Sequence, residues 1–258
     1  MSAPRCSTID LLRADPRFAS LKRSLDVYYG DTDREIAMDA LYGRFLAKSS
    51  LAFDIGSHVG DRIASFRRLG ARVVALEPQP DCMAVLDVLY CCDGAVTLVN
   101  SACGPQPGEL TLHVNTANPT VTTASPAFIE AADGAGGWEG QVWDREMSVP
   151  VTTLDAIIAR HGMPDFVKID VEGFEADVLA GLSLPVPALS FEFTTIQRDV
   201  AYDCLDRLEQ LGNFAFDIAL GESQSLSYGR WVSAEAMRRH IESLPHEANS
   251  GDVYAVLV

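Results

Sequence analysis

The hydrophobic pattern divides the chain near residue 50. Before that point, apolar residues recur at helical spacing in two stripes. The first stripe is Leu11, Leu12, Phe18, Leu21 and Leu25, and the second is Ile36, Met38, Leu41, Tyr42, Phe45 and Leu46. Between them, residues 30–33 read Gly-Asp-Thr-Asp, which predicts a turn and a helix N-cap. The pattern therefore predicts a helical extension over residues 1–50.

From residue 51 onward, short apolar runs alternate with helical stretches, which is typical of a parallel sheet with crossover helices. The runs predict strands over 51–55, 72–76, 96–99, 166–170, 188–193, 214–220 and 253–258, with an extra strand over 110–114. The intervening stretches predict helices over 61–69, 80–90, 153–161, 174–182, 199–211 and 234–244. We therefore expect one α/β domain over residues 51–258.

Residues 115–150 interrupt this alternation with a stretch rich in proline and glycine. A loop this long inside a compact domain is usually functional or mobile, and its place before the next βα unit predicts a lid over a substrate site. Trp138 and Trp143 lie in it, where their indoles either stack on a substrate ring or anchor the loop to the core. For Trp231 anchoring is the favoured interpretation.

Charge and cysteine content narrow the class of partner and the compartment. The chain has 36 acidic and 20 basic residues, a net charge of −16, which argues against nucleic acid or an anionic membrane as a partner. The beginning of the sequence lacks the apolar region of a signal peptide, and no run is long enough to span a membrane. The six cysteines form no C-x-x-C pair, which predicts reduced thiols in a cytoplasmic protein.

The first βα turn, residues 53–60, reads Phe-Asp-Ile-Gly-Ser-His-Val-Gly and is a candidate cofactor loop. Gly56 and Gly60 allow a sharp turn and a close backbone approach to a ligand. A dinucleotide site would show G-x-G-x-x-G and hold a pyrophosphate, which Asp54 would repel. The acid instead suits a cofactor that carries an ammonium group, which points to S-adenosylmethionine. An NAD-dependent oxidoreductase is the alternative.

The next two strand ends carry weaker signals for the same site. Glu77 ends the second strand, where a carboxylate can accept both hydroxyls of a ribose. Ser101 and Ala102 follow the third strand, where an adenine edge would lie, although an ordinary turn with small residues fits equally well.

Five stretches match, in order, a known family. They are 53–60, Ala-Leu-Glu-Pro at 75–78, Ala-Cys-Gly at 102–104, Thr-Thr-Leu-Asp at 152–155 and Val-Lys-Ile-Asp-Val-Glu-Gly-Phe-Glu at 167–175. With the Leu-Ser-Phe-Glu-Phe strand at 189–193, the sequence resembles the FkbM family of S-adenosylmethionine-dependent methyltransferases over roughly residues 50–220. The resemblance implies a Rossmann-like class I methyltransferase fold, with a seven-stranded, mostly parallel sheet whose last strand is antiparallel. It also implies methyl transfer, most often to a hydroxyl of a sugar or secondary metabolite.

The turn and the resemblance together define an expected cofactor set. It comprises Asp54, Gly56, Ser57, His58, Gly60, Glu77, Pro78, Ser101, Ala102 and Asp170. Ser57-His58 stands where the family more often shows Ala-Asn, and His58 is expected to donate to the carboxylate of the cofactor.

Four charged residues are expected at the carboxyl edge of the sheet, where open α/β folds bind ligands. Lys168, Asp170 and Glu172 alternate along one strand and its end, so they share one side, and Glu192 lies near the tip of the next strand. In one interpretation Asp170 or Glu172 is the general base that an alcohol acceptor needs, with Lys168 as an electrostatic partner. In the other, the group is an ion-pair network that joins Lys168 to Glu192.

Three carboxylates within reach could also hold Mg²⁺, but a metal-free base is favoured and no metal site is predicted. The leading hypothesis is an O-methyltransferase that acts on a small-molecule or glycan acceptor. A binding scaffold that has kept the cofactor fold without turnover is a further alternative. The N-terminal helices are a candidate surface for a homo-oligomer.

Overall fold

The computed structural model describes residues 6–258 and centres on one seven-stranded sheet. Its strand order is β3-β2-β1-β7-β8-β10-β9. The strands are β1 (Leu51–Ile55), β2 (Arg72–Leu76), β3 (Val96–Val99), β7 (Phe166–Ile169), β8 (Ala188–Thr194), β9 (Phe214–Leu220) and β10 (Ser250–Leu257). The last strand, β10, lies between β8 and β9 and runs antiparallel to both. This arrangement confirms the predicted fold class.

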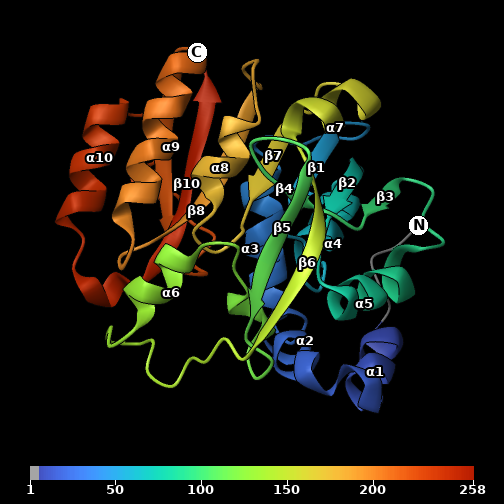
Figure 1. Ribbon diagram of the computed structural model, residues 1–258. Helices are drawn as coiled ribbons and strands as arrows, with labels where there is room; N and C mark the ends of the chain where they lie inside the picture. Colours follow the sequence, from blue (N-terminus) through green and yellow to red (C-terminus); the bar gives the residue numbers. More distant parts are fainter. Residues whose placement is uncertain (1–5) are drawn as a thin grey trace.

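Helices cover both faces of the sheet, which makes three layers (Figure 1). The helices are α1 (Cys6–Ala14), α2 (Lys22–Tyr28), α3 (Thr32–Tyr42), α4 (Asp61–Arg68), α5 (Pro80–Tyr90), α6 (Pro126–Ala132), α7 (Leu154–His161), α8 (Glu175–Ala180), α9 (Arg198–Leu211) and α10 (Ala234–Ser243), with 3₁₀ turns η1 (Pro16–Leu21), η2 (Pro119–Val121) and η3 (His246–Ala248). Successive strand residues point to opposite faces. Phe53 and Ile55 therefore pack with α7 to α10, whereas Ala52 packs with α3 and α4.

Residues 115–150 contain more regular structure than the sequence suggests. They include η2 and α6, and from Arg145 onward they form most of strand β6 (Arg145–Thr152). This strand pairs with β5 (Gly108–Val114) and β4 (Ala102–Cys103) in a separate three-stranded sheet. The predicted strand over 110–114 is thus right, but its partner was missed. Strand β6 contains Pro150 and buries only one of its side chains, so no buried apolar run marks it.

The N-terminal helices pack against the domain along one side. Leu12, Phe18 and Leu25 are buried in a cluster that includes Val85 of α5. Asp31 is the expected N-cap of α3, because its carboxylate accepts the N–H groups of residues 33 and 34. The helical pattern is therefore largely correct.

Two positions of the predicted apolar stripes are wrong. Leu11 is 72 % exposed and Ile36 is 62 % exposed. Neighbouring residues on a helix point about 100° apart, so Leu11 faces away when Leu12 faces inward. These side chains contribute nothing to the core.

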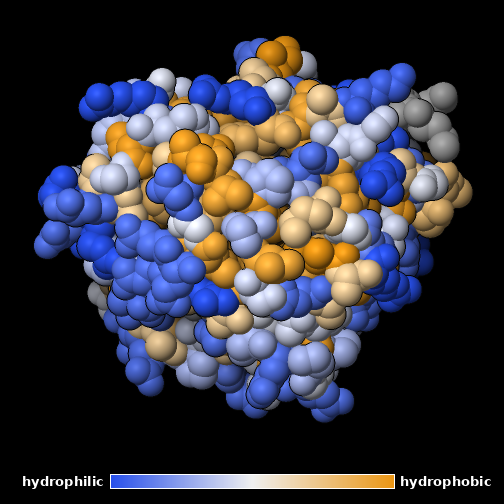
Figure 2. Space-filling model, turned by 90° about the horizontal axis from the view of Figure 1, so that it is seen from above, coloured by the Kyte–Doolittle hydropathy of each residue, from blue (hydrophilic) through white to orange (hydrophobic). Residues whose placement is uncertain are grey.

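At the edge of the sheet where the parallel strands begin, the molecular surface shows apolar groups interspersed with charged ones (Figure 2). Met163, Leu184 and Leu257 are exposed there, near the beginnings of β7 and β8 and at the end of β10.

Among residues 6–258, no helix combines the length and the apolar character that crossing a bilayer requires.

Candidate functional site

A cavity of about 260 Å³ lies at the carboxyl ends of the parallel strands. The loops after β1, β2, β3 and β7 and the end of β8 form its walls, together with the segment 120–124, Tyr28 of α2 and residues of the loop before β10. The predicted site residues that line it are Asp54, Gly56, Ser57, His58, Glu77, Pro78, Ser101, Ala102, Lys168, Asp170, Glu172 and Glu192. The fold thus gathers nearly every candidate into one space.

Gly60 is the predicted residue that does not line the cavity. It is the N-cap of α4 with φ +83°, and its carbonyl accepts a 2.6 Å hydrogen bond from Tyr90. A Cβ at this position would lie 2.7 Å from the side chains of Leu86 and Tyr90. The glycine therefore allows α5 to pack closely under the turn.

Gly56 shapes the turn itself. Its φ is +84°, and a Cβ would lie 1.9 Å from the carbonyl oxygen of Asp170. Ser57 donates to the carbonyl of Asp54 at 3.0 Å and so closes the turn. The loop after β1 consequently lies directly against the end of β7, as a shared ligand site requires.

Asp54 and Glu77 are two buried carboxylates with different surroundings. The Oδ2 atom of Asp54 is buried and has no hydrogen-bond partner among residues 6–258. Glu77 accepts the backbone N–H groups of His58 and Gln79, each at 2.8 Å. Burial raises the pKa of both carboxyl groups to about 7. Of the two, Asp54 is therefore the one with an oxygen that accepts no hydrogen bond, and the residue lines the cavity.

His58 is held between two other elements. Its backbone has φ +46°, and its ring nitrogens lie 3.5 Å from Cys82 Sγ and 3.5 Å from Thr120 Oγ1. Burial lowers the pKa of the imidazole to about 4, so the ring is neutral at pH 7. The side chain thereby ties α5 to the segment after β5.

Ser101 lies where the loop after β3 meets the small sheet. Its hydroxyl donates to the carbonyl of Pro150 in β6 at 2.9 Å. The predicted adenine edge is thus bordered by the small sheet, which also contributes Leu110 and Leu112 to the cavity wall.

Lys168 does not pair with Glu192, the partner that the ion-pair interpretation named. Lys168 Nζ instead lies 2.8 Å from Asp252 Oδ1 and 3.0 Å from Asp170 Oδ2. Burial alone would lower the pKa of Lys168, but these two carboxylates raise it well above its usual range. Conversely, Lys168 outweighs burial and keeps the pKa of Asp170 low. Asp252 was missed because the position of β10 beside β8 is decided by the tertiary fold.

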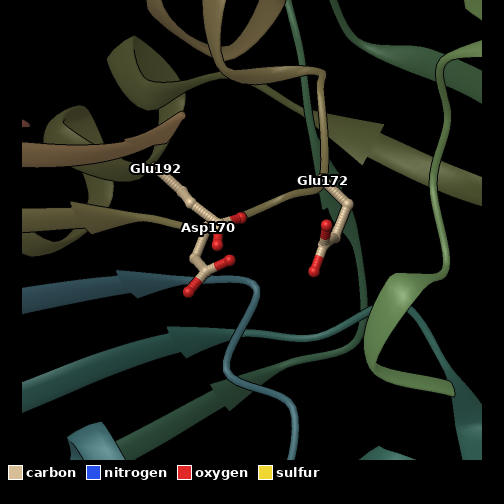
Figure 3. A group of neighbouring side chains, drawn as sticks. All are labelled: Asp170, Glu172 and Glu192. Carbon is tan, nitrogen blue, oxygen red and sulfur yellow. The ribbon is translucent and has the colours of Figure 1, made fainter. Parts of the chain in front are cut away.

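Asp170, Glu172 and Glu192 form a compact carboxylate cluster (Figure 3). One oxygen of each lies within 4.8 Å of the others. Burial, together with the charge of Asp170, raises the pKa of Glu172 and of Glu192 well above the usual range. The predicted catalytic carboxylates therefore do meet at one point of the cavity.

The backbone that carries Glu172 is braced on both sides. Glu172 has φ +56°, and its carbonyl accepts a 2.6 Å hydrogen bond from Thr123. The buried carboxylate of Glu175 accepts the N–H groups of Val171, at 3.0 Å, and of Gly173, at 3.1 Å. Glu175 was quoted in the family motif, but its support of this loop could not be read from the sequence.

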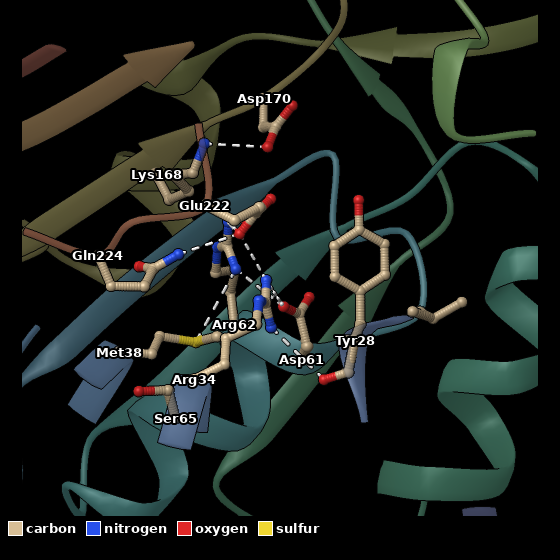
Figure 4. Close-up of polar contacts among 12 residues, drawn as sticks. Tyr28, Arg34, Met38, Asp61, Arg62, Ser65, Lys168, Asp170, Glu222 and Gln224 are labelled. Carbon is tan, nitrogen blue, oxygen red and sulfur yellow. Dashed lines mark hydrogen bonds and ion pairs between the residues drawn. The ribbon is translucent and has the colours of Figure 1, made fainter. Parts of the chain in front are cut away.

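The wall of the cavity also holds an ion network beside Lys168 that the sequence did not indicate (Figure 4). Arg62 pairs with Asp61 at 2.8 Å and with Glu222 at 3.3 Å. Arg34 of α3 pairs with the same two carboxylates at 3.0 and 2.7 Å, and its guanidinium lies over the ring of Tyr28. Because these residues come from α2, α3, α4 and the loop after β9, no local motif could have revealed them.

Both tryptophans of the segment 115–150 act as anchors. Trp138 donates to Asn249 Oδ1 at 3.1 Å, and Trp143 donates to the carbonyl of Val121 at 2.8 Å. Each indole meets Phe128 of α6 edge to face. Trp138 also lines the cavity. The anchoring interpretation thus holds for both, and Trp138 is in addition available to a ligand.

The sheet order and the position of the cavity define a class I methyltransferase-like α/β protein. A family model described as a methyltransferase FkbM domain matches residues 54–244. The chain belongs to the FkbM methyltransferase family and is an S-adenosylmethionine-dependent methyltransferase. A search of curated protein sequences finds no match.

Several solved structures that resemble the chain are described as methyltransferases, at low sequence identity. A precorrin-6y C5,15-methyltransferase from Geobacter metallireducens is 14 % identical, with 87 % of each chain covered and a TM-score of 0.44. Aeropyrum pernix fibrillarin with natively bound S-adenosyl-L-methionine is 11 % identical, with 86 % of this chain and 74 % of that chain covered and a TM-score of 0.42. A putative O-methyltransferase from Klebsiella pneumoniae is 12 % identical, with 97 % and 96 % covered and a TM-score of 0.39.

Proposed function

We propose that the protein transfers the methyl group of S-adenosylmethionine to a hydroxyl of a small molecule or glycan in the cytoplasm. The observation that carries the proposal is the meeting of three carboxylates, Asp170, Glu172 and Glu192, at the end of the cavity next to the cofactor loop. A hydroxyl acceptor must lose a proton as it is methylated, and a positioned carboxylate can take it.

The cofactor end of the cavity fits the proposed ligand. Asp54 Oδ2 is a buried acceptor without a donor, and the ammonium group of the methionine part is a matching donor. Glu77 is held by two backbone N–H groups and has further lone pairs for ribose hydroxyls. Pro78, Ser101 and Ala102 border the place left for adenine. S-adenosylmethionine supplies an electrophilic methyl on a sulfonium when it is bound.

The chain contributes positioning and a proton acceptor to the reaction. Displacement at the methyl requires the acceptor oxygen in line with the sulfonium, so the enclosed cavity reduces the entropic barrier. Asp170 or Glu172 accepts the hydroxyl proton. Of the two, Glu172 is the stronger base when ionised, because burial raises the pKa of its carboxyl group. Lys168 holds Asp170 in place through its ion pair.

A ligand-binding measurement tests the cofactor assignment. We expect S-adenosylhomocysteine to raise the melting temperature of the full chain, since a ligand at 100 times its Kd stabilises by about 2.7 kcal/mol. NAD at the same concentration should give no shift. Stabilisation by NAD alone would overturn the proposal in favour of an oxidoreductase.

A variant pair tests the catalytic assignment. Glu172→Gln should lower methyl transfer from labelled S-adenosylmethionine to a panel of sugars, glycans and other alcohols, while S-adenosylhomocysteine affinity is unchanged. Glu209→Gln, an exposed change of the same kind on α9, is the matched control. If the purified protein binds cofactor but methylates nothing on a broad panel, the scaffold alternative is favoured.

A further inference from the structure

We propose that Asp170, Glu172 and Glu192 form a binding site for a compact cation at the acceptor end of the cavity. The cation is either a divalent metal ion or an ammonium group on the acceptor. The two sources share one chemistry, which is a positive charge held by several carboxylate oxygens. The inference rests on the proposed function only in that the neighbouring part of the cavity holds the cofactor.

The geometry suits such a ligand. The three carboxylates come from the end of β7, from the loop that follows it and from β8, and they converge on one space (Figure 3). Their nearest oxygens lie within 4.8 Å of one another, so a single ion could contact all three. Mg²⁺ and Ca²⁺ prefer oxygen ligands of this kind.

Glu172 supplies an observation that is independent of the clustering. Its residue is 8 % exposed, it lines the cavity, and its carboxylate accepts no hydrogen bond from any of residues 6–258. Its carboxylate oxygens are not among the fully buried atoms, so they remain open to the cavity, where a ligand can reach them. The contacts of Thr123 and Glu175 fix the backbone on either side and so hold the unpartnered group toward the cavity.

The charge balance of the cavity leaves Glu172 and Glu192 without a counter-ion of the described chain. Lys168 is shared by Asp170 and Asp252. Arg62 is engaged by two carboxylates of the ion network, Asp61 and Glu222. The lining contains seven carboxylates, namely Asp54, Asp61, Glu77, Asp170, Glu172, Glu192 and Glu222, and two cations, Arg62 and Lys168. A bound cation would compensate this excess where it is greatest.

The two sources would serve the reaction differently. A divalent ion beside the acceptor oxygen would lower the pKa of the hydroxyl and stabilise the developing alkoxide. An ammonium group of the acceptor would instead orient the neighbouring hydroxyl toward the methyl group. In either case, an acceptor that carries a phosphate or carboxylate at this position would be disfavoured by repulsion.

Calorimetric titration of the full chain saturated with S-adenosylhomocysteine tests the inference. One arm uses MgCl₂ and MnCl₂, and the other uses glucosamine and ethanolamine, with glucose and ethylene glycol as neutral matches. We expect saturable binding in one of the two arms and none for the neutral matches. Glu172→Gln and Glu192→Gln should each weaken that binding by at least about tenfold. Glu209→Gln should leave it unchanged.

Two results would overturn the inference. One is the absence of saturable binding in both arms, and the other is binding that both glutamine variants retain in full. S-adenosylhomocysteine affinity, measured first on each protein, separates this failure from that of the proposed function. If the unmodified chain does not bind S-adenosylhomocysteine, the result argues against the proposed function. If it binds S-adenosylhomocysteine but no cation, the result argues against the cation site alone. Thermal unfolding confirms that each variant is folded.

Discussion

At the residue scale, the site depends on carboxylates that the fold holds in unfavourable surroundings. Asp54 is 1 % exposed and has an unpaired oxygen. Such a group costs stability when it is ionised and is retained where a ligand supplies the missing donor. Cofactor binding and stability should therefore respond in opposite directions when the charge is removed.

Asp54→Asn tests this opposition. Because burial raises the pKa of Asp54 to about 7, the ionised group destabilises the free protein at pH 8. The variant should gain on the order of 2–4 kcal/mol of unfolding free energy at pH 8 and less than half as much at pH 5, where the folded protein still holds the proton that the unfolded chain has released. S-adenosylhomocysteine binding, measured by calorimetry, should be lost or greatly weakened. Asp203→Asn, an exposed change on α9, is the control, and unchanged affinity in Asp54→Asn would contradict the cofactor assignment.

Gly56→Ala tests the close approach between the loop after β1 and the end of β7. A Cβ there would meet the carbonyl oxygen of Asp170 at 1.9 Å, and positive φ adds strain. We expect a loss of about 3 kcal/mol or more in urea unfolding, and no cofactor binding. Gly134→Ala has a φ of +72° with no atom within 4 Å of the added Cβ, so it should cost only about 1 kcal/mol. Equal losses in the two variants would show that the contact is unimportant.

At the scale of elements, two polar contacts link residues 115–150 to the segment that precedes β10. Trp138 is bonded to Asn249, and the ring of His246 lies 3.0 Å from the carbonyl of Gly136. Both contacts join the segment after α6 to the turn that precedes β10. We propose that this segment is a lid over the acceptor, with Trp138 as the side chain that reaches the cavity.

Trp138→Phe should weaken the link between this segment and the turn before β10 without disturbing the cofactor end of the cavity. The variant keeps an aromatic ring beside Phe128 but loses the hydrogen bond to Asn249, which should cost about 1 kcal/mol. Hydrogen exchange of residues 134–143 should become faster, while S-adenosylhomocysteine affinity stays the same. Trp231→Phe, outside this segment, is the matched control. If hydrogen exchange in residues 134–143 does not change, the hydrogen bond between Trp138 and Asn249 does not hold this segment in place.

At the scale of the whole molecule, the N-terminal helices are part of the site. Tyr28 of α2 lines the cavity, and Arg34 of α3 joins the ion network on its wall. Burial opposes ionisation of Glu222, but Arg62 and Arg34 lower its pKa to about 2. The helical extension therefore closes one side of the cavity. The sequence predicted the extension but no site residue within it.

The pH dependence of stability is a property of the whole molecule. Burial raises the pKa of Asp54, Glu77 and Glu175 to about 7, against ordinary values of 3.8 for Asp and 4.5 for Glu. Between about pH 4 and 7 the folded protein therefore holds protons that the unfolded chain has released. The unfolding free energy should fall as the pH rises through this window and level off above it.

Urea unfolding of the ligand-free protein at pH 5.5 and pH 8 measures this effect. We expect several kcal/mol less stability at pH 8, and a smaller difference when S-adenosylhomocysteine is bound, because the ligand provides donors to the ionised groups. Asp54→Asn should reduce the difference in the ligand-free protein. Stability that rises from pH 5.5 to pH 8 would contradict the assigned protonation states.

The sequence predicted most of the sheet and most of the cofactor end, for a common reason. Strands that are buried on both faces, such as β1, appear as continuous apolar runs, and the predicted bounds 51–55, 72–76 and 96–99 agree with the structure. Asp54 lies near the end of β1, and Gly56 and Glu77 directly follow β1 and β2, so their meeting at one edge follows from parallel pairing. Local sequence is sufficient where a residue is placed by its own strand.

The tertiary structure decided what depends on contacts between distant segments. Asp252 reaches Lys168 only because β10 inserts beside β8, and Arg34 reaches Glu222 only because α3 packs beside the loop after β9. Strand β6 exists through its pairing with β5 rather than through an apolar run of its own. Sequence by itself determined the fold class, the family and the cofactor loop. Only the folded chain determined the partner of each buried charge, because a buried charge is stabilised by whichever group packing brings within a few ångströms.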